Sequence, residues 1–307
     1  MKNKAGVIAL VLSILCICLT GVLYFWSFSI IKEADEQISI LESEIHRIEG
    51  LHQEKETFDT ESIETGKEKQ TINKSESNAV ETVLTEMQME TESSQTNGYT
   101  VAIDPGHQGS WVNMSELEPS APGSSEMKAK ATTGTAGMYT GIPEYQLNLD
   151  ISLALCTELE KRGYTVVMTR TDNDTAISNA ERAVKAYQEG GDIYVRIHAN
   201  GSEDTSICGA LGMTPSYDNA YVGYLAEDSY RLTECILNAY CAETGFKNLG
   251  IQYHDDMTGI NWSQIPVTIL EMGFMTNESD DAAMADKAVR EKMVAGIANG
   301  IDQYFGR

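Results

Sequence analysis

The chain has no excess of basic residues. Its 22 Lys and Arg side chains stand against 46 Asp and Glu side chains, which gives a formal net charge of −24 at pH 7. A protein that binds nucleic acid needs a basic face to neutralise phosphates. The charge balance therefore argues against a nucleic-acid partner. It also shows no polybasic patch of the kind that binds anionic lipids.

Cysteine is scarce and poorly spaced for a metal site. The chain has six cysteines, and Cys16 and Cys18 lie in an apolar run near the N-terminus. The other four are Cys156, Cys208, Cys235 and Cys241. None of these four forms the C-x-x-C pair that is typical of thiolate zinc sites, so we interpret them as packing residues.

Charged side chains are missing altogether from residues 5–31, "AGVIALVLSILCICLTGVLYFWSFSII". About 20 apolar residues suffice to cross a bilayer. A cleaved signal peptide has a shorter apolar core and a small-residue exit, which Ser-Phe-Ser at 27–29 matches poorly. Lys2 and Lys4 precede the run, so the positive-inside rule makes residues 1–4 a cytoplasmic tail. We predict a transmembrane signal anchor over 5–31, with the rest of the chain outside the cytoplasm.

Two polar segments follow the predicted anchor. Residues recur at alternating spacings of three and four at Ile31, Ala34, Ile38, Leu41, Ile45, Ile48 and His52. This pattern favours a short helical or coiled-coil segment over 32–52, either a solvated helix or a parallel homodimer through 31–52. Residues 53–97 are rich in Glu, Thr, Ser, Gln and Lys, with too few apolar side chains to offset the entropy lost on folding. We predict a disordered acidic stalk there.

Residues 98–307 alternate strand and helix patterns, which marks them as the folded domain. Strand patterns occupy 99–103, 164–169, 193–197 and 267–270, with weaker ones at 210–213 and 250–253. Helical patterns occupy 144–162, 178–189, 221–244 and 287–304. Such alternation predicts an α/β fold in which helices flank a mixed, largely parallel sheet.

Four polar residues stand where such a fold places its ligands. His107 follows the first strand in "VAIDPGHQG", His198 follows the strand "IYVRI", Glu271 follows the apolar run "IPVTIL", and Glu144 opens a helix. In open α/β sheets, ligands bind beyond the carboxyl ends of the strands. Two imidazoles and a carboxylate are a ligand set that Zn²⁺ uses in catalytic sites, and a second carboxylate can then act as the base.

Each of these residues also has an ordinary structural interpretation. A histidine after a strand is more often a hydrogen-bonded turn residue, and a glutamate at a helix start is usually a favourable charge. Glu271 fits this interpretation less well, because a carboxylate behind an apolar run is costly to bury unless it is paired or functional. His254 is a competing ligand, although its polar surroundings favour an exposed loop. Spacing along the chain does not show whether these residues meet.

The order of the motifs adds a resemblance to a known family. The segments "VAIDPGHQG", "GIPEYQLNLDIS", "VMTRTDND", "AERA", "IYVRIHANGS" and "VTILEMGFMTN" resemble the zinc-dependent N-acetylmuramoyl-L-alanine amidases of the Amidase_3 type. The resemblance covers residues 99–304. It implies that His107, Glu144 and His198 bind Zn²⁺ and that Glu271 is the catalytic carboxylate. It also implies a peptidoglycan substrate. This agrees with the topology predicted from the apolar run, a single-pass protein of the cell membrane whose catalytic domain, 98–307, faces the cell wall.

The implied reaction is hydrolysis of the amide between N-acetylmuramic acid and the L-alanine of the stem peptide. Two alternatives stay open: a zinc peptidase acting within the stem peptide, and a catalytically inactive wall-binding protein. Asp104 and Asn200 neighbour the two histidines along the chain. They either orient the imidazoles or serve as turn and capping residues.

Three features depart from the family pattern. Gln108 stands where the family usually has glycine, and Arg196 stands where a small residue is more common. The sequence assigns Arg196 no role. A segment rich in Gly, Ser, Ala and Met, 110–140, separates the first two predicted ligands. We expect it to border the substrate groove, where it tunes substrate choice or access, unless it is an inert surface insertion.

Overall fold

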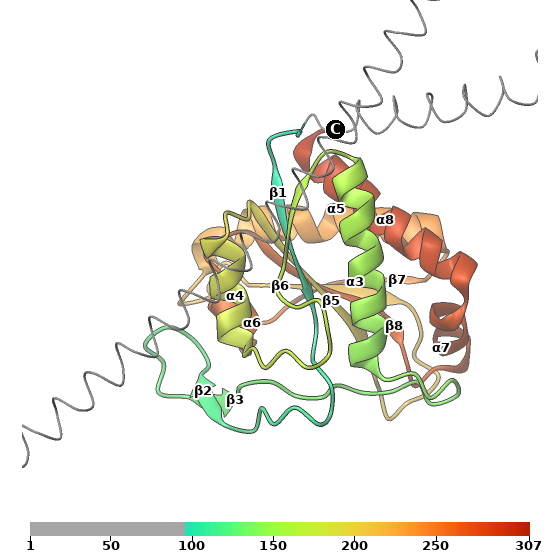
Figure 1. Ribbon diagram of the computed structural model, residues 1–307, viewed down its shortest axis with the longest axis horizontal. Coiled ribbons are helices and arrows are strands. Elements are labelled where there is room, and N and C mark those ends of the chain that lie inside the picture. The colour runs from blue at the N-terminus through green and yellow to red at the C-terminus, as the bar shows by residue number, and fades with distance from the viewer. Residues whose placement is uncertain (1–95) are drawn as a thin grey trace, which may run out of the picture. The chain divides into compact units, whose positions relative to one another are not determined.

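The computed structural model describes residues 96–307, which fold around a six-stranded sheet (Figure 1). In spatial order the strands are β4 (Thr165–Met168), β1 (Thr100–Pro105), β5 (Ile193–Asn200), β8 (Val267–Phe274), β6 (Ala210–Thr214) and β7 (Asn248–Tyr253). The first four run parallel, whereas β6 pairs antiparallel with β8, and β7 runs parallel to β6. The predicted mixed, largely parallel sheet is confirmed.

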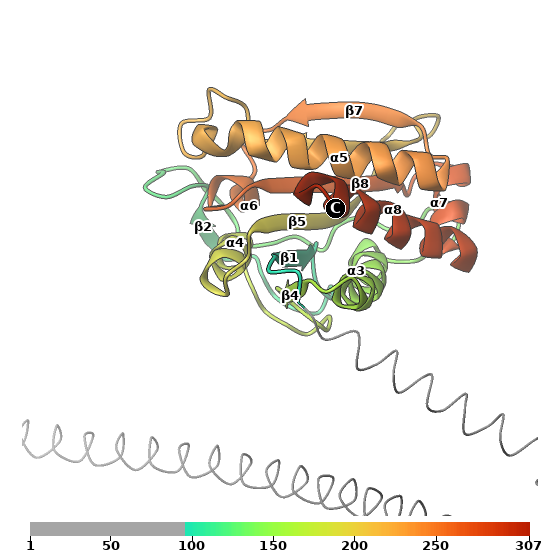
Figure 2. The same cartoon turned by 90° about the horizontal axis from the view of Figure 1, so that it is seen from above.

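Helices cover both faces of this sheet, as predicted. Three long helices lie on one face: α3 (Glu144–Lys161), α5 (Ala226–Thr244) and α8 (Lys287–Phe305). Two shorter helices, α4 (Asn179–Gln188) and α6 (Thr258–Asn261), lie on the other. Figure 2 shows α3 and α8 on the side of the sheet opposite α4 and α6. A further helix, α7 (Glu278–Ala285), connects β8 to α8.

The long helices owe their place to apolar stripes. In α3 the buried stripe comprises Leu147, Ile151, Leu155 and Leu159, which recur every four residues. In α8 the equivalent positions are Met293, Ile297 and Ile301. Because residues four apart share one face of a helix, each stripe packs as a unit against the sheet. These stripes join the larger of the two apolar cores.

Helix α4 has a polar start signal instead. Ser178 accepts a hydrogen bond from the backbone N–H of Glu181, and the Glu181 side chain accepts one from the backbone N–H of Ser178. This capping box satisfies two N–H groups that no helical bond would reach. It fixes where α4 begins, and with it the position of Arg182 on the buried side of the helix.

The sequence patterns missed the short elements. A hairpin of β2 (Leu117–Pro119) and β3 (Met127–Ala129) lies within the 110–140 segment, and α6 and α7 are also present. Elements this short carry too few residues to show a period. The helix predicted from residue 221 begins instead as a single 3₁₀ turn, Gly223–Leu225, before α5.

The predictions for 1–4, 5–31, 32–52 and most of the stalk lie outside the described residues. Within 96–307, none of the helices combines the length and apolar character that a membrane span requires. At the start of this range, the Asn97 side chain donates a hydrogen bond to the Arg162 carbonyl. Tyr99 stacks on Phe305 with ring centroids 4.1 Å apart. The first described residues are therefore packed against the domain's C-terminal helix.

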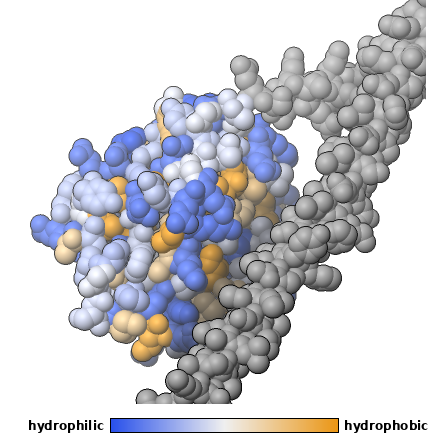
Figure 3. Space-filling model, turned by 60° about the vertical axis from the view of Figure 1, so that its left-hand side comes forward, coloured by the Kyte–Doolittle hydropathy of each residue, from blue (hydrophilic) through white to orange (hydrophobic). Residues whose placement is uncertain are grey.

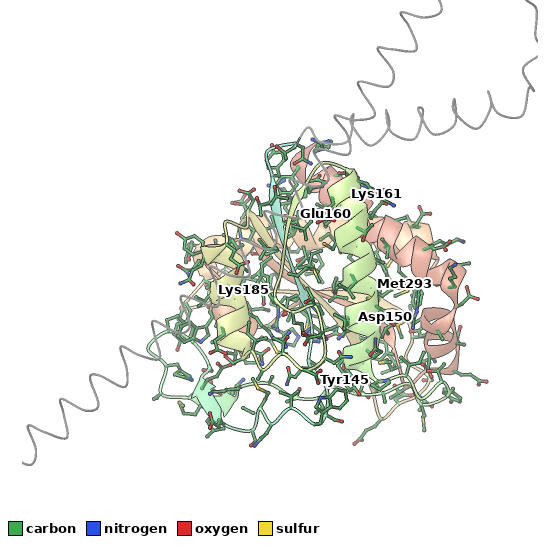
Figure 4. The ribbon with its side chains drawn as sticks, in the orientation of Figure 1. Tyr145, Asp150, Glu160, Lys161, Lys185 and Met293 are labelled. Carbon is green, nitrogen blue, oxygen red and sulfur yellow. The ribbon has the colours of Figure 1, made fainter. Side chains whose placement is uncertain are left out.

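One edge of the sheet gathers the elements that matter for function. The carboxyl ends of β1, β5 and β8 meet there, beside the N-terminal end of α3 and the β2–β3 hairpin (Figure 1). Figure 4 labels Tyr145 at that end of α3, while Glu160 and Lys161 lie at the opposite end. On the face of the domain drawn in Figure 3, hydrophilic residues predominate and apolar residues form small scattered groups. Because the predicted ligands stand at these strand ends and at the start of α3, they all lie at this one edge of the sheet.

Candidate metal centre

The three predicted ligands converge at this edge. His107, Glu144 and His198 each offer one ligand atom, and these atoms lie within 4.8 Å of one another. His107 Nε2 is 3.1 Å and His198 Nδ1 is 3.2 Å from the same oxygen, Glu144 Oε1. The two imidazole rings meet edge to face, with centroids 4.8 Å apart. Residues separated by up to 91 positions in the chain thus form one compact group.

The backbone at His107 is turned into an unusual conformation. Its φ of 63° makes it the one non-glycine residue with positive φ in the described part of the chain. Such conformations cost energy and persist where the surroundings hold them in place. Here the holding contact is Nδ1–H, which donates to the Thr132 carbonyl at 2.9 Å. That hydrogen bond leaves the Nε2 lone pair directed at the group of ligands.

Glu144 is the first residue of α3, and its carboxylate is 3% exposed. Oε2 accepts a hydrogen bond from the Thr135 N–H at 2.9 Å, and Oε1 accepts one from the Ala199 N–H at 3.1 Å. Burial by itself raises the pKa of Glu144, but the neighbouring imidazoles of His107 and His198 bring it well below the usual range. The carboxylate is therefore ionised in the buried site.

His198 is held in its neutral form. Burial lowers the pKa of His198 to about 4, although its hydrogen bond with Glu144 opposes the shift. Its Nε2 is buried and has no hydrogen-bond partner among the described residues. A neutral imidazole with an unused buried nitrogen has the protonation state that a metal ligand needs.

Glu271 lies beside this group, and its burial and neighbouring charges set the pKa of its carboxyl group. It is opposite His198 in the β5–β8 register and is 9% exposed. Burial, followed by the charge of Glu144, raises the pKa of Glu271 to about 8, while Arg196 opposes the rise. Within the described chain its Oε2 finds no hydrogen-bond partner. A carboxylate whose pKa lies near neutrality suits the exchange of protons.

These residues line a cavity of about 710 Å³. One wall is the 128–135 stretch, which includes Thr132 and Thr135, and another is the 200–203 loop. A third is the loop and short helix at 256–259. The 110–140 segment therefore borders the cavity, as expected, and it also supplies the backbone groups that hold His107 and Glu144.

Two glycines make the close packing possible. At Gly106 a Cβ atom would overlap the imidazole of His198. At Gly134, where φ is +74°, it would overlap the Glu144 carboxylate and the His107 ring. These positions exclude larger residues because ligand side chains occupy the space that a Cβ would need.

The structure corrects the orienting role considered for Asp104. Its carboxylate is fully buried and accepts hydrogen bonds from Arg182 Nη1 at 2.7 Å and Arg196 Nε at 2.8 Å. Thr169 and Tyr194 also donate to it, whereas no imidazole does among the described residues. Asp104 anchors buried arginines instead. Asn200 is the last residue of β5, and its side chain accepts a hydrogen bond from the N–H of Gly201.

Other candidate residues lie elsewhere or have local roles. His254 bonds with Gln252 and Asp256 and is not part of the ligand group. The Gln108 side chain is buried and accepts a hydrogen bond from Arg182 Nη2, so it ties the His107 turn to α4. The four described cysteines are free and half-buried. Sequence reasoning missed Thr132 and Thr135, whose backbone groups carry no residue-type signal, although the Thr132 hydroxyl also lies 3.1 Å from His107 Nδ1.

Comparisons with known proteins agree with the fold and the site. Residues 101–303 match the Amidase_3 family, N-acetylmuramoyl-L-alanine amidase. The chain therefore belongs to this family of enzymes, and the resemblance seen in its motifs is confirmed.

Relatives of the chain differ in length. YqiI of Bacillus subtilis, an uncharacterised protein, is 28% identical over 208 residues, which cover 68% of this chain and 85% of that protein. The N-acetylmuramoyl-L-alanine amidase LytC of Bacillus subtilis is 29% identical over 68% of this chain and 36% of its own length. The probable cell wall amidase LytH of Staphylococcus aureus is 28% identical, over 59% of its length. The match thus spans about a third and three fifths of the two named amidases.

Solved structures share the fold. The N-acetylmuramyl-L-alanine amidase Ami1 of Mycobacterium smegmatis superposes with a TM-score of 0.62 at 25% identity, covering 69% of this chain and 99% of that one. Ami1 of Mycobacterium abscessus gives a TM-score of 0.61 at 27% identity, covering 68% and 99%. The domain over 96–307 therefore corresponds to a complete amidase domain in those structures.

Proposed function

We propose that this protein hydrolyses the amide bond between N-acetylmuramic acid and L-alanine in peptidoglycan. In this proposal Zn²⁺ is held by His107, Glu144 and His198, and Glu271 is the catalytic carboxylate. The observation that carries the proposal is that the imidazoles of His107 and His198 both approach one oxygen, Oε1, of the buried Glu144 carboxylate. Family membership supports the choice of bond.

The residues present fit a zinc ion. Two neutral imidazoles and an ionised carboxylate form a three-ligand set of the kind found in catalytic zinc sites. Among the described residues, the buried Glu271 Oε2 has no hydrogen-bond partner, which is costly for a polar group. The water that accompanies a cation held by His107, Glu144 and His198 would satisfy it. When bound, Zn²⁺ supplies a Lewis acid that polarises the amide carbonyl and activates a water molecule.

The chain's own residues transfer the protons and hold the ligand side chains in position. Glu271 accepts a proton from the attacking water and returns it to the amide nitrogen as the C–N bond breaks. Glu271 lies opposite His198 on the neighbouring strand and lines the same cavity as the ligand group, which is where a proton acceptor is needed. Thr132 and Thr135 keep His107 and Glu144 in place through their backbone groups. The surrounding walls form a cavity of about 710 Å³ in which these residues meet the substrate.

The chemical ends left after digestion test this proposal. The full chain is incubated with purified peptidoglycan, and the products are identified by liquid chromatography and mass spectrometry. We expect a free lactyl carboxylate on N-acetylmuramic acid and a new N-terminal L-alanine. New ends inside the stem peptide would support the peptidase alternative, and binding without any new ends would support a wall-binding protein.

Location remains part of the proposal. We place the domain outside the cytoplasm, tethered to the cell membrane through 5–31 and spaced from it by the 53–97 stalk, with 31–52 available for a parallel homodimer. The support is the uncharged apolar run behind Lys2 and Lys4. Protease added to cells stripped of their wall should release a folded domain by cutting in the stalk. Protection of the domain in that experiment would rule out the outward orientation.

A further inference from the structure

Arg196 is a buried cation in the wall of the cavity. It lies two residues before His198 on β5, so both side chains project from the same face of the sheet. In the register with β8, Arg196 pairs with Ile269 and His198 pairs with Glu271. Arg196 therefore lies two residues farther from the carboxyl end of its strand than His198, and the same distance below the level of Glu271. Its side chain is 4% exposed, and that remainder opens on the cavity.

Two nitrogens of the guanidinium are hydrogen-bonded, and the third, Nη1, lies against Gly259. Nε donates to Asp104 Oδ2 at 2.8 Å, and Nη2 donates to Asn179 Oδ1 at 2.8 Å. The group packs against Gly259, where a Cβ atom would overlap it. Nη1 donates to no acceptor within the described residues. Two of the five N–H groups, one on Nε and one on Nη2, are anchored in this way, so the planar group is oriented before any ligand arrives.

The charge around this group is unbalanced. Asp104 accepts hydrogen bonds from both Arg182 and Arg196, so one carboxylate serves two guanidinium groups. Arg170, which is also buried, donates to backbone carbonyls of Pro105, Gly106 and Tyr145. Arg196 therefore shares its hydrogen-bonded carboxylate with Arg182, and of the three arginines it is Arg196 that lines the cavity, together with Glu271. A buried guanidinium that shares its carboxylate with a second arginine can accept a further anionic partner.

We infer that Arg196 binds a carboxylate of the stem peptide and makes the enzyme prefer substrates in which that carboxylate is free over those in which it is amidated. The inference rests on the proposed function, since the peptide in the cavity is the one attached to the scissile amide. A carboxylate gives Arg196 an ionised acceptor in addition to Asp104, which it shares with Arg182. A carboxamide offers Nη1 only a neutral acceptor, which makes the weaker hydrogen bond.

Two soluble muropeptides test the inference directly. N-acetylmuramoyl-L-alanyl-D-isoglutamate and its D-isoglutamine counterpart differ in one group, a carboxylate against a carboxamide. A charge-assisted hydrogen bond to a buried group corresponds to roughly a 10- to 100-fold preference, and we expect this in kcat/KM of the full-length protein. In Arg196→Gln the preference should fall to about one, through loss on the acidic substrate, with the amidated substrate affected much less.

A second variant tests the inference independently, in case Arg196→Gln does not fold. Gly259→Ala keeps the arginine and its charge but places a methyl group where the guanidinium packs. It should also lower the preference, because the fork would move away from its bound position. Lys128→Gln is the control, since Lys128 is another cation of the cavity wall but already donates to the Asp256 carbonyl. It should change both substrates equally.

The outcomes separate the inference from the proposed function. Equal cleavage of both muropeptides by the unaltered protein would overturn the inference alone. A preference that survives Arg196→Gln, or that disappears in Lys128→Gln, would overturn it as well. Binding of both muropeptides is also measured with fluorescent derivatives. If neither is cleaved but the acidic one binds more tightly in an Arg196-dependent way, the inference holds and the assignment of the bond is wrong.

Discussion

The two faces of the sheet are held together by different forces. Under α3, α5 and α8 the contacts are aliphatic, from stripes such as Leu155 in α3 and Ile297 in α8. Under α4 and α6 a smaller apolar core shares the space with Asp104 and two of the buried arginines, Arg182 and Arg196. The apolar face can tolerate small shifts, whereas the polar face has to keep donors and acceptors in register. The edge that carries the proposed metal ligands continues this polar face, because Arg196 and His198 project from the same side of β5.

The largest effect should come from changes at that edge. Glu271→Gln keeps the size of the side chain but removes the proton acceptor, so we expect turnover to fall by about 10²–10⁴-fold with bound metal retained. His107→Ala should lower metal content and turnover together. Zinc stoichiometry and muropeptide release are measured on the same samples, with circular dichroism to verify folding. A folded, metal-loaded Glu271→Gln protein with nearly full activity would rule out the mechanism.

Asp104→Asn tests whether the polar face is a source of stability. It leaves Arg182 and Arg196 buried without their shared carboxylate, a change that typically costs about 3–5 kcal/mol. Urea unfolding of the described domain gives the measurement. The control is Asp150→Asn, because Asp150 pairs with Arg290 at 3.1 Å near the surface. Such exposed pairs contribute about 0–1 kcal/mol, so comparable losses in both variants would contradict the contrast.

Ile297→Ala makes the corresponding change on the apolar face. Removing a buried aliphatic side chain should cost about 2–5 kcal/mol in the free energy of unfolding. Because Ile297 packs in the core under α3, α5 and α8 and has no contact with the ligand group, metal content and turnover per folded molecule should not change. A drop in zinc stoichiometry at constant folded fraction would show that the faces are coupled more tightly than their contacts indicate.

The smallest effect is a dependence on pH. Burial by itself raises the pKa of Asp104, but Arg182 and Arg196 hold it well below the usual value. A lowered carboxylate pKa adds stability that is fully present above the unfolded value, about 3.9, and is lost as the pH falls toward the folded value. The stability gap between the unaltered protein and Asp104→Asn should therefore be constant from about pH 5 to 7 and narrow below about pH 4. A gap that widens in acid would contradict this assignment.

Sequence patterns predicted what repeats along the chain. The stripes of α3 and α8 and the apolar strands were predicted from spacing, because each lies within one element. The candidate ligands were also found, because each follows a strand or opens a helix. Their convergence was not predicted by spacing, since it depends on strand order. Arg196 had no interpretable signal either, because Asp104, the residue that anchors it, lies 92 positions away. The positive φ of His107 and the backbone contacts of Thr132 arise from tertiary packing.

The 128–135 stretch lines the cavity and also contacts two of the proposed metal ligands. It lines one wall of the cavity, while its Thr132 carbonyl and Thr135 N–H hold His107 and Glu144. Mutational drift that reshapes this wall would therefore be selected through metal affinity as well as through substrate fit. The walls at 200–203 and 256–259 make no hydrogen bond to His107 or Glu144 among the described residues. New substrate preferences in related enzymes would be expected to arise there, with the 128–135 wall the slowest to diverge.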